Sequence, residues 1–115
     1  MMKTIALLIS LLCIPIANAN YLGGKVPIYI YGNSNISFGI NNPPLKYVCS
    51  YYSRNFTFDA TTEAGRNMLS ILLAAKMANK KIDIWYQPSS KPGTTHKNGC
   101  GGAIAVVYAI GIADY

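Results

Sequence analysis

The sequence predicts an α+β fold that is mainly β: a small OB-type barrel with one long helix between the N-terminal strands and the last two strands. Three observations predict it. Short segments with period-2 alternation fill the region before residue 60, one helical stretch follows, and two more strand-like segments end the chain. A chain of 115 residues has room for one such domain.

Residues 1–19 have the three parts of a secretory signal peptide. Lys3 supplies the basic start, an apolar core runs over 5–16, and residues 17–19 (Ala-Asn-Ala) give a small-x-small cleavage site. We therefore expect a single domain over residues 20–115 in a secreted or periplasmic protein. No other segment approaches the ~18 apolar residues that a membrane-spanning helix needs.

The first two predicted strands form a hairpin. Residues 25–31 (KVPIYIY) alternate and are expected to bury Val26, Ile28 and Ile30. Because Pro27 cannot donate to a ladder, this is an edge strand or the start of a strand. After a turn over 32–35, a second strand covers 36–40. Its core face is predicted to carry Ile36, Phe38 and Ile40.

A third strand over 47–52 and a short one over 56–58 are expected before the helix. The third strand carries Cys49. Since Cys13 leaves with the signal peptide, Cys49 and Cys100 remain. An even pair of cysteines in a small secreted chain is most simply one disulfide.

The stretch from Thr61 to Lys81 reads as one amphipathic helix, with Asp59 or Thr61 as candidate cap. Its polar side has no polar continuation in the second half. Either this face inserts deeply into the protein's own fold, or it meets copies of itself in a ring. In the second case the predicted interface comprises Arg66, Ser70, Leu73, Ala74 and Met77.

The last two predicted strands flank a long polar loop over 87–102. The first, 82–86, has Ile82, Ile84 and Tyr86 on its core face. The second, Ala103–Ala113, has large residues at even positions and mostly small ones at odd positions. We expect the large side to fill the core and the small side to allow close approach of another backbone. Because neither side is polar, this strand should be central or lie at an interface.

The chemistry of an enzyme is missing. The four acids of the region after the leader make no recognisable carboxylate pair, and no set of metal ligands has suitable spacing. We expect no catalysis, no cofactor and no metal; a small hydrolase using the lone His96 is the third hypothesis considered below. The 10 basic residues are scattered, which disfavours nucleic-acid binding. A net positive charge instead suits an acidic cell surface or sialylated glycans.

Binding chemistry is easier to build. An aromatic platform next to amide and basic groups can stack on a sugar ring and bond its hydroxyls. The predicted ligand-binding residues stand at the end of the first of the last two strands and in the loop after it: Trp85, Tyr86, Gln87, Lys91 and His96. Trp85 has packing as its alternative role, and His96 that of a solvated loop residue.

The run over 67–113 resembles the C-terminal half of the B subunits of AB5 toxins. The matching pieces are NMLSILLAAKMANKK, IDIWY, QPSSKPGTTHKNG and GAIAVVYAIGIA. The chain is also similar to small secreted bacterial proteins akin to the subtilase-cytotoxin and pertussis-like B subunits. The elements that fit their pattern are Cys49, the run 81–85 (KIDIW) and Cys100.

The resemblance implies an OB-fold subunit of a homopentamer, with helices around a central pore, glycan sites outside and a possible A subunit as partner. In cholera-like B subunits a tryptophan at the end of this strand, then an asparagine and a lysine, contact the sugar. Trp85 stands at the tryptophan position, Gln87 near the asparagine, and Lys91 is a loose match for the lysine. The first hypothesis is therefore a non-catalytic glycan-binding subunit.

The second hypothesis is a monomeric periplasmic or secreted protein-binding module, for example an enzyme inhibitor. Its contact would be the basic loop over 91–97.

Overall fold

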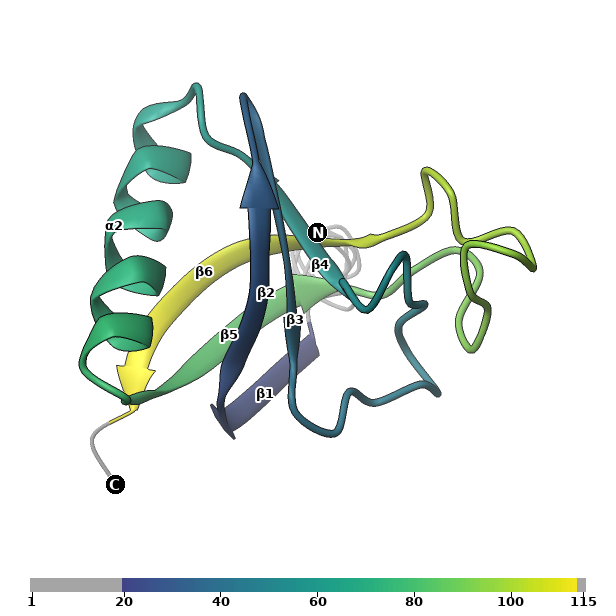
Figure 1. Ribbon diagram of the computed structural model, residues 1–115, viewed down its shortest axis with the longest axis horizontal. Coiled ribbons are helices and arrows are strands. Elements are labelled where there is room, and N and C mark those ends of the chain that lie inside the picture. Colours follow the sequence, from purple (N-terminus) through teal and green to yellow (C-terminus); the bar gives the residue numbers. More distant parts are fainter. Residues whose placement is uncertain (1–19, 114–115) are drawn as a thin grey trace, which may run out of the picture.

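The computed structural model describes residues 20–113; the predicted signal peptide, residues 1–19, lies outside the described residues. In Figure 1 a helix lies beside a strongly curved sheet. The elements in chain order are β1 (Asn20–Lys25), β2 (Pro27–Gly32), β3 (Asn35–Ile40), β4 (Phe56–Asp59), α2 (Glu63–Met77), β5 (Lys81–Gln87) and β6 (Ala105–Ala113). Within residues 20–113, no helix is long and apolar enough to cross a membrane.

The six strands form one mixed sheet in the order β1-β5-β6-β4-β3-β2. Only β4 and β6 pair in parallel; the other neighbours are antiparallel. The predicted α+β, mainly β class is therefore confirmed. The sheet is not closed by a ladder, because β1 and β2 are its two edges. Only Val26 separates these edges in sequence, so the chain passes directly from one edge to the other.

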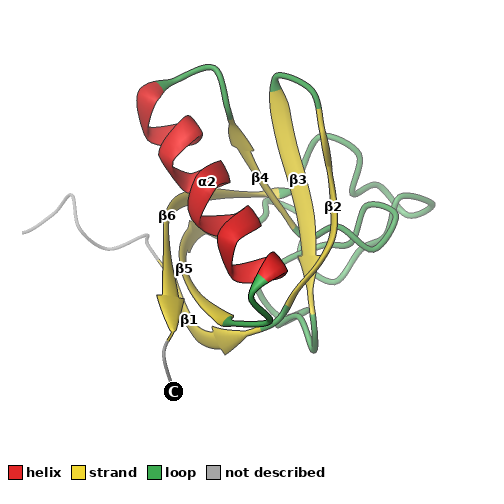
Figure 2. Ribbon diagram, turned by 60° about the vertical axis from the view of Figure 1, so that its left-hand side comes forward, coloured by secondary structure: helices red, strands yellow, loops and turns green. Residues whose placement is uncertain are grey.

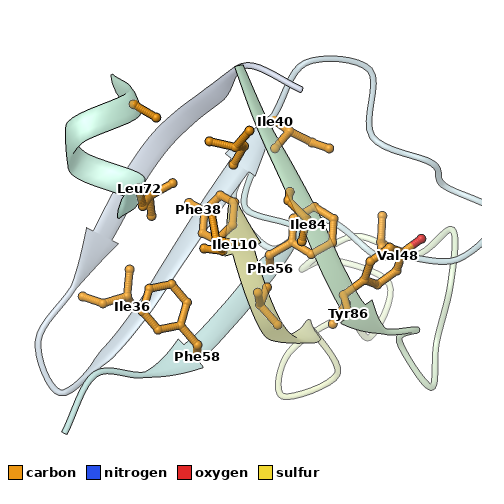
Figure 3. Packing of buried hydrophobic residues seen from close by; sticks show 14 residues of the cluster. Ile36, Phe38, Ile40, Val48, Phe56, Phe58, Leu72, Ile84, Tyr86 and Ile110 are labelled. Atoms are coloured by element: carbon orange, nitrogen blue, oxygen red, sulfur yellow. The ribbon is translucent and has the colours of Figure 1, made fainter. Parts of the chain in front are cut away.

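The core lies between the curved sheet and α2, which contacts β6, β2 and β5 (Figure 2). Three aromatic rings form its centre: Phe56 packs 5.6 Å from Phe38 and 5.2 Å from Tyr86, measured between ring centroids. The predicted core faces over 36–40 and 82–86 are confirmed as buried (Figure 3). Each such side chain contributes roughly 1.5–3 kcal/mol through removal of apolar surface from water.

The first hairpin is confirmed, since β2 and β3 pair antiparallel, but its start differs from the prediction. Val26 is exposed and Pro27 is buried. Val26 stands at the corner between β1 and β2, where the chain changes edge. A register shift between Ile28 and Tyr31 accompanies a φ of 49° at Tyr29, which is the signature of a β-bulge.

The predicted third strand over 47–52 is wrong. This segment makes only isolated bridges, Ser50 with Thr95 and Tyr51 with Arg54. A tight turn follows Tyr51 and lies against Gly39 of β3, so the chain cannot continue as a ladder. The predicted disulfide is present: Cys49 and Cys100 are bonded and fully buried, with their Cα atoms 5.7 Å apart.

The helix is confirmed, but its cap is neither of the two expected residues, and it ends at Met77 instead of near Lys81, which is already the first residue of β5. Thr62 is the N-cap, and its hydroxyl accepts a hydrogen bond from the Gly65 backbone N–H at 2.9 Å. Asp59 instead accepts from the backbone N–H and the hydroxyl of Thr61. Those two bonds lower the pKa of Asp59 below its ordinary value, the side-chain bond having the larger effect.

The face of α2 that is polar in the first half of the helix and apolar in the second half points to solvent. Leu73 is 43% exposed and Met77 is 86% exposed, whereas Leu72 and Ala75 on the opposite side are fully buried. The interpretation that this face inserts into the protein's own fold is therefore wrong. All members of the predicted interface are exposed in the single chain: Arg66, Ser70, Leu73, Ala74 and Met77.

The last strand is central, between β5 and β4, as expected, but its predicted core side is wrong before Tyr108 and holds after it only at Ile110. Of the large residues, only Ile110 belongs to the buried core, and Ala105 and Val107 are buried instead. The partners of adjacent β5 residues 85 and 86 are Ala109 and Val107. One extra residue, Tyr108, is thus inserted, and it reverses which parity faces the core.

Candidate functional site

A hollow of about 710 Å³ opens at the end of the sheet where the loops over 41–55 and 88–104 meet. In Figure 1 these loops project from the side of the molecule away from α2. We call the hollow the aromatic pocket. Its apolar wall includes Ile28, Ile40 and Pro43, and its aromatic wall consists of Tyr29, Tyr52 and His96.

The most ordered feature of the aromatic pocket is a ring stack. Tyr52 and His96 lie nearly parallel, with ring centroids 3.9 Å apart and an interplanar angle of 17°. The ring of Tyr51 meets both of them edge-on. Tyr52 is still 56% exposed, so a ligand can reach it.

Cationic groups border the same rings. The Arg54 guanidinium lies 4.6 Å from the ring centroid of Tyr31 and within cation–π range of Tyr51 and Tyr52. Arg54 also donates to the Tyr51 carbonyl at 3.2 Å and to the hydroxyl of Ser37 at 3.4 Å. Lys97 lines the aromatic pocket, and none of the described lining residues is acidic.

The pocket stands on strained backbone. Tyr51 and Arg54 exchange two backbone hydrogen bonds, 2.8 and 3.0 Å long, around a two-residue turn. Its central residues have positive φ, 51° at Tyr52 and 66° at Ser53. Such turns favour Asn-Gly, because other residues pay about 1–3 kcal/mol each for this conformation. With Tyr29, three strained residues line this one pocket, which is the pattern of a functional site.

Buried polar contacts support the turn from below. The Asn55 side chain, 2% exposed, donates to the Cys49 carbonyl at 3.1 Å and to the Ser50 hydroxyl at 2.8 Å. Ser50 in turn donates its backbone N–H to the Thr94 carbonyl at 2.9 Å. Together with the disulfide, these bonds tie the two pocket loops to each other.

The predicted ligand-binding residues do not meet in one place. His96 lies in the aromatic pocket. Trp85 lies on the face of the sheet away from the core, 41% exposed and 4.9 Å from the ring of Tyr21. Gln87 is on that same face and accepts a hydrogen bond from the hydroxyl of Tyr108.

Tyr86 and Lys91 lie elsewhere. Tyr86 is 1% exposed and packs against Phe56, so its side chain is not accessible to a surface ligand. Lys91 is exposed on the loop, where its backbone N–H donates to the Ser89 hydroxyl at 3.0 Å, and it does not line the aromatic pocket.

The sequence prediction missed Tyr52 and Arg54. The run over 51–55 (YYSRN) contains the turn-favouring residues Ser53 and Asn55 directly after two aromatics. A turn placed at residues 52 and 53, between Tyr51 and Arg54, would have brought the tyrosines to a loop tip instead of a strand.

Within residues 20–113, no group of three or more His, Cys, Asp or Glu side chains could hold a metal ion. No protein-family model, no curated protein and no solved structure matches this chain.

Proposed function

We propose that this protein is a secreted, non-catalytic binding subunit that recognises glycans in the aromatic pocket. The observation that carries the proposal is the stacked pair Tyr52–His96 beside Arg54. A sugar ring needs a flat aromatic surface for its C–H face and nearby polar groups for its hydroxyls. Ser50 and Thr95 supply polar groups in the same hollow.

The charge of the pocket favours an acidic sugar, such as that of a sialylated glycan. Lys97 lines the pocket and none of the described lining residues is acidic. The Arg54 guanidinium, outside the lining, lies 5.9 Å from the ring centroid of Tyr52, and the whole chain carries +6. An arginine binds a carboxylate through two parallel hydrogen bonds, which gives direction as well as affinity.

The B-subunit resemblance adds self-association, for which α2 gives a physical argument. Its exposed face is polar around Arg66 and Ser70 and apolar around Leu73 and Met77. An antiparallel pair centred on this face would set the apolar half against the polar half. In a parallel arrangement, the apolar half of one helix meets the apolar half of its neighbour, and copies related by the rotation axis of a closed ring can pack in this way. We therefore propose a homopentamer, in which weak sites gain avidity.

The topology supports the OB-type barrel that such a subunit requires. β1 and β2 are separated only by Val26, which supports our proposal that they act as one bent strand of a five-stranded, partly open barrel. An A subunit as further partner rests on the resemblance alone.

A glycan array, followed by calorimetry on the best acidic glycan, tests the proposal. Tyr52→Ala should abolish the signal, and Trp85→Ala, an exposed aromatic outside the aromatic pocket, should leave it unchanged. Loss only in Trp85→Ala would move the site to the outer sheet face. Absence of any glycan signal for the unaltered protein would contradict the proposed function. A hydrolase using His96 would require product formation that His96→Ala abolishes.

A protein-binding module is the second candidate, and a different surface favours it. Exposed Tyr21, Trp85, Val106 and Tyr108 gather on β1, β5 and β6; we call this the outer aromatic face. Tyrosine and tryptophan are enriched in protein interfaces. The protein-binding candidate would be favoured over the glycan-binding one by two results together. The unaltered protein would be a monomer that binds no glycan, and it would bind a protein partner that the Trp85→Ala variant no longer binds. Contact through the basic loop over 91–97 instead would survive Trp85→Ala.

A further inference from the structure

We propose that Gly39 is the positioning residue of the aromatic pocket. Because it has no side chain, the turn of Tyr52 and Ser53 can sit directly on β3, and this seat holds the Tyr52 ring flat against His96. The use of the pocket for glycans rests on the proposed function; the positioning of the rings does not.

The steric argument is direct. A β-carbon on Gly39 would lie 2.1 Å from the carbonyl oxygen of Ser53 and 3.3 Å from its carbonyl carbon. Gly39 itself cannot retreat, since its strand pairs with β2 on one side and β4 on the other. Any side chain at this position must therefore displace the turn.

The turn has little freedom to shift while keeping its shape. Tyr52 and Ser53 both have positive φ, which only surrounding contacts can maintain in residues with a β-carbon. The paired hydrogen bonds between Tyr51 and Arg54 close the turn. The next residue, Asn55, donates its backbone N–H to the Phe38 carbonyl at 2.9 Å, directly beside Gly39.

The loop of His96 is anchored to residues that precede the turn: Ser50 donates its backbone N–H to the Thr94 carbonyl at 2.9 Å, and Cys49 forms the disulfide with Cys100. A shift confined to Tyr52 and Ser53 therefore does not carry His96 with it. The backbone N–H groups of Asn98 and Cys100 both donate to the Thr95 carbonyl, at 3.0 and 2.9 Å. The Cys49–Cys100 disulfide fixes the end of this loop. A displaced Tyr52 therefore separates from His96, and the flat aromatic wall of the pocket is lost.

Gly39→Ala in the mature protein tests this inference by NMR. In the unaltered protein, the imidazole protons of His96 should be shifted upfield by the ring current of Tyr52. The variant should lose that shift, and glycan affinity should fall about tenfold, the equivalent of ~1.4 kcal/mol. The matched control is Gly111→Ala in β6, where a β-carbon meets no atom within 4 Å; it should keep both properties.

A second pair of variants approaches from the turn and leaves β3 unchanged, in case Gly39→Ala does not fold. Ser53→Val places a β-branched residue at positive φ, which it strongly disfavours, and should lose the upfield shift. Ser53→Gly accepts the same φ and should keep it. An upfield shift that survives in folded Gly39→Ala or in Ser53→Val would overturn the inference. Loss of the shift with unchanged glycan affinity would leave the positioning role standing and contradict the proposed function.

Discussion

Thr62 shows how much a single hydroxyl contributes to this fold. It satisfies the Gly65 backbone N–H at the start of α2, which otherwise has no partner within the helix. Thr62→Ala should lower the free energy of unfolding by about 1 kcal/mol, measured by urea denaturation. Ser70→Ala is the control: the exposed Ser70 hydroxyl donates to the Arg66 carbonyl within the helix, and its loss should be nearly neutral. Equal effects of the two changes would contradict the cap.

Tyr86 makes stability depend on alkaline pH. Burial raises its pKa above the ordinary value of 10.0; a hydrogen bond with Asn20 opposes this rise, and the charge of Tyr47 adds to it. The folded protein thus keeps a proton that the unfolded chain has already lost. The contribution of protonated Tyr86 to the free energy of unfolding is fully present below pH 10.0, and it is lost as the pH rises above that value.

Tyr86→Phe removes this titration. The fall in the urea midpoint between about pH 9 and about pH 11 should therefore be smaller in the variant than in the unaltered protein. Since the other tyrosines titrate in both proteins, the difference between the two isolates Tyr86. An identical fall in both would show that Tyr86 ionises alike in the folded and unfolded states.

At the scale of elements, the disulfide holds together two loop segments that no β-ladder joins. The segment around Cys49 makes only isolated bridges, and the loop over 88–104 contains no strand. Cys49 and Cys100 are 51 residues apart in sequence, so closing this loop constrains the unfolded chain by about 4 kcal/mol.

The double variant Cys49→Ala/Cys100→Ala should lose stability of about that size, ~4 kcal/mol in urea denaturation. It should also lose the upfield shift of His96, because the loop that carries His96 is no longer fixed. The control is the unaltered protein in strong reductant, in which the disulfide is open but both sulfur atoms are still present. It should behave like the double variant. A double variant as stable as the disulfide-bonded protein would show that the hydrogen bonds alone hold the loops.

The elements that the sequence predicted correctly are those with a local cause. β3 and β5 alternate cleanly with one buried face, and α2 has a long run of helix-forming residues. The errors have non-local causes. The bulge at Tyr108 reverses the faces of β6, and period-2 reasoning cannot detect it without the register against β5. The tyrosines over 51–52 have high strand propensity, yet the turn seated on Gly39 overrides it.

The candidate site was predictable only in part for the same reason. His96 was singled out from the sequence, but Tyr52, the residue on which its ring stacks, is distant in the chain. Trp85 was placed correctly on its strand, whereas Gln87, expected in the following loop, is also part of β5. Neither residue lines the aromatic pocket that contains His96. Residue types and strand periodicity predict which side chains can stack on a ligand, whereas loop closure by the disulfide decides which of them meet.

At the scale of the whole molecule, α2 and the loops over 41–55 and 88–104 lie on opposite sides (Figure 1), and these loops supply most of the lining of the aromatic pocket. Contacts between helices of several copies would therefore leave every pocket open. An assembly of this kind presents several weak sites to one surface, and its avidity can exceed the single-site affinity by about 10²–10⁴. The exposed helix face and the shallow pocket thus fit one binding strategy.

Light scattering on the mature protein tests that arrangement. Since a cyclic homopentamer is proposed, the mass should be about five times that of one chain. Leu73→Glu and Met77→Glu, tested separately, should each give folded monomers, because both side chains are already exposed in the single chain. Ala64→Glu is the control; nine residues from Leu73, it lies on the opposite side of the helix and should leave the assembly intact.

The circular dichroism spectra of the monomeric variants distinguish a lost contact between copies from unfolding of the chain. A native spectrum would place Leu73 and Met77 at the contact between copies, as an exposed apolar half-face requires. Unfolding of both variants would contradict the exposure of this face. A monomeric unaltered protein would exclude the ring and leave avidity without a basis, so that the proposed glycan binding would have to rely on a single aromatic pocket.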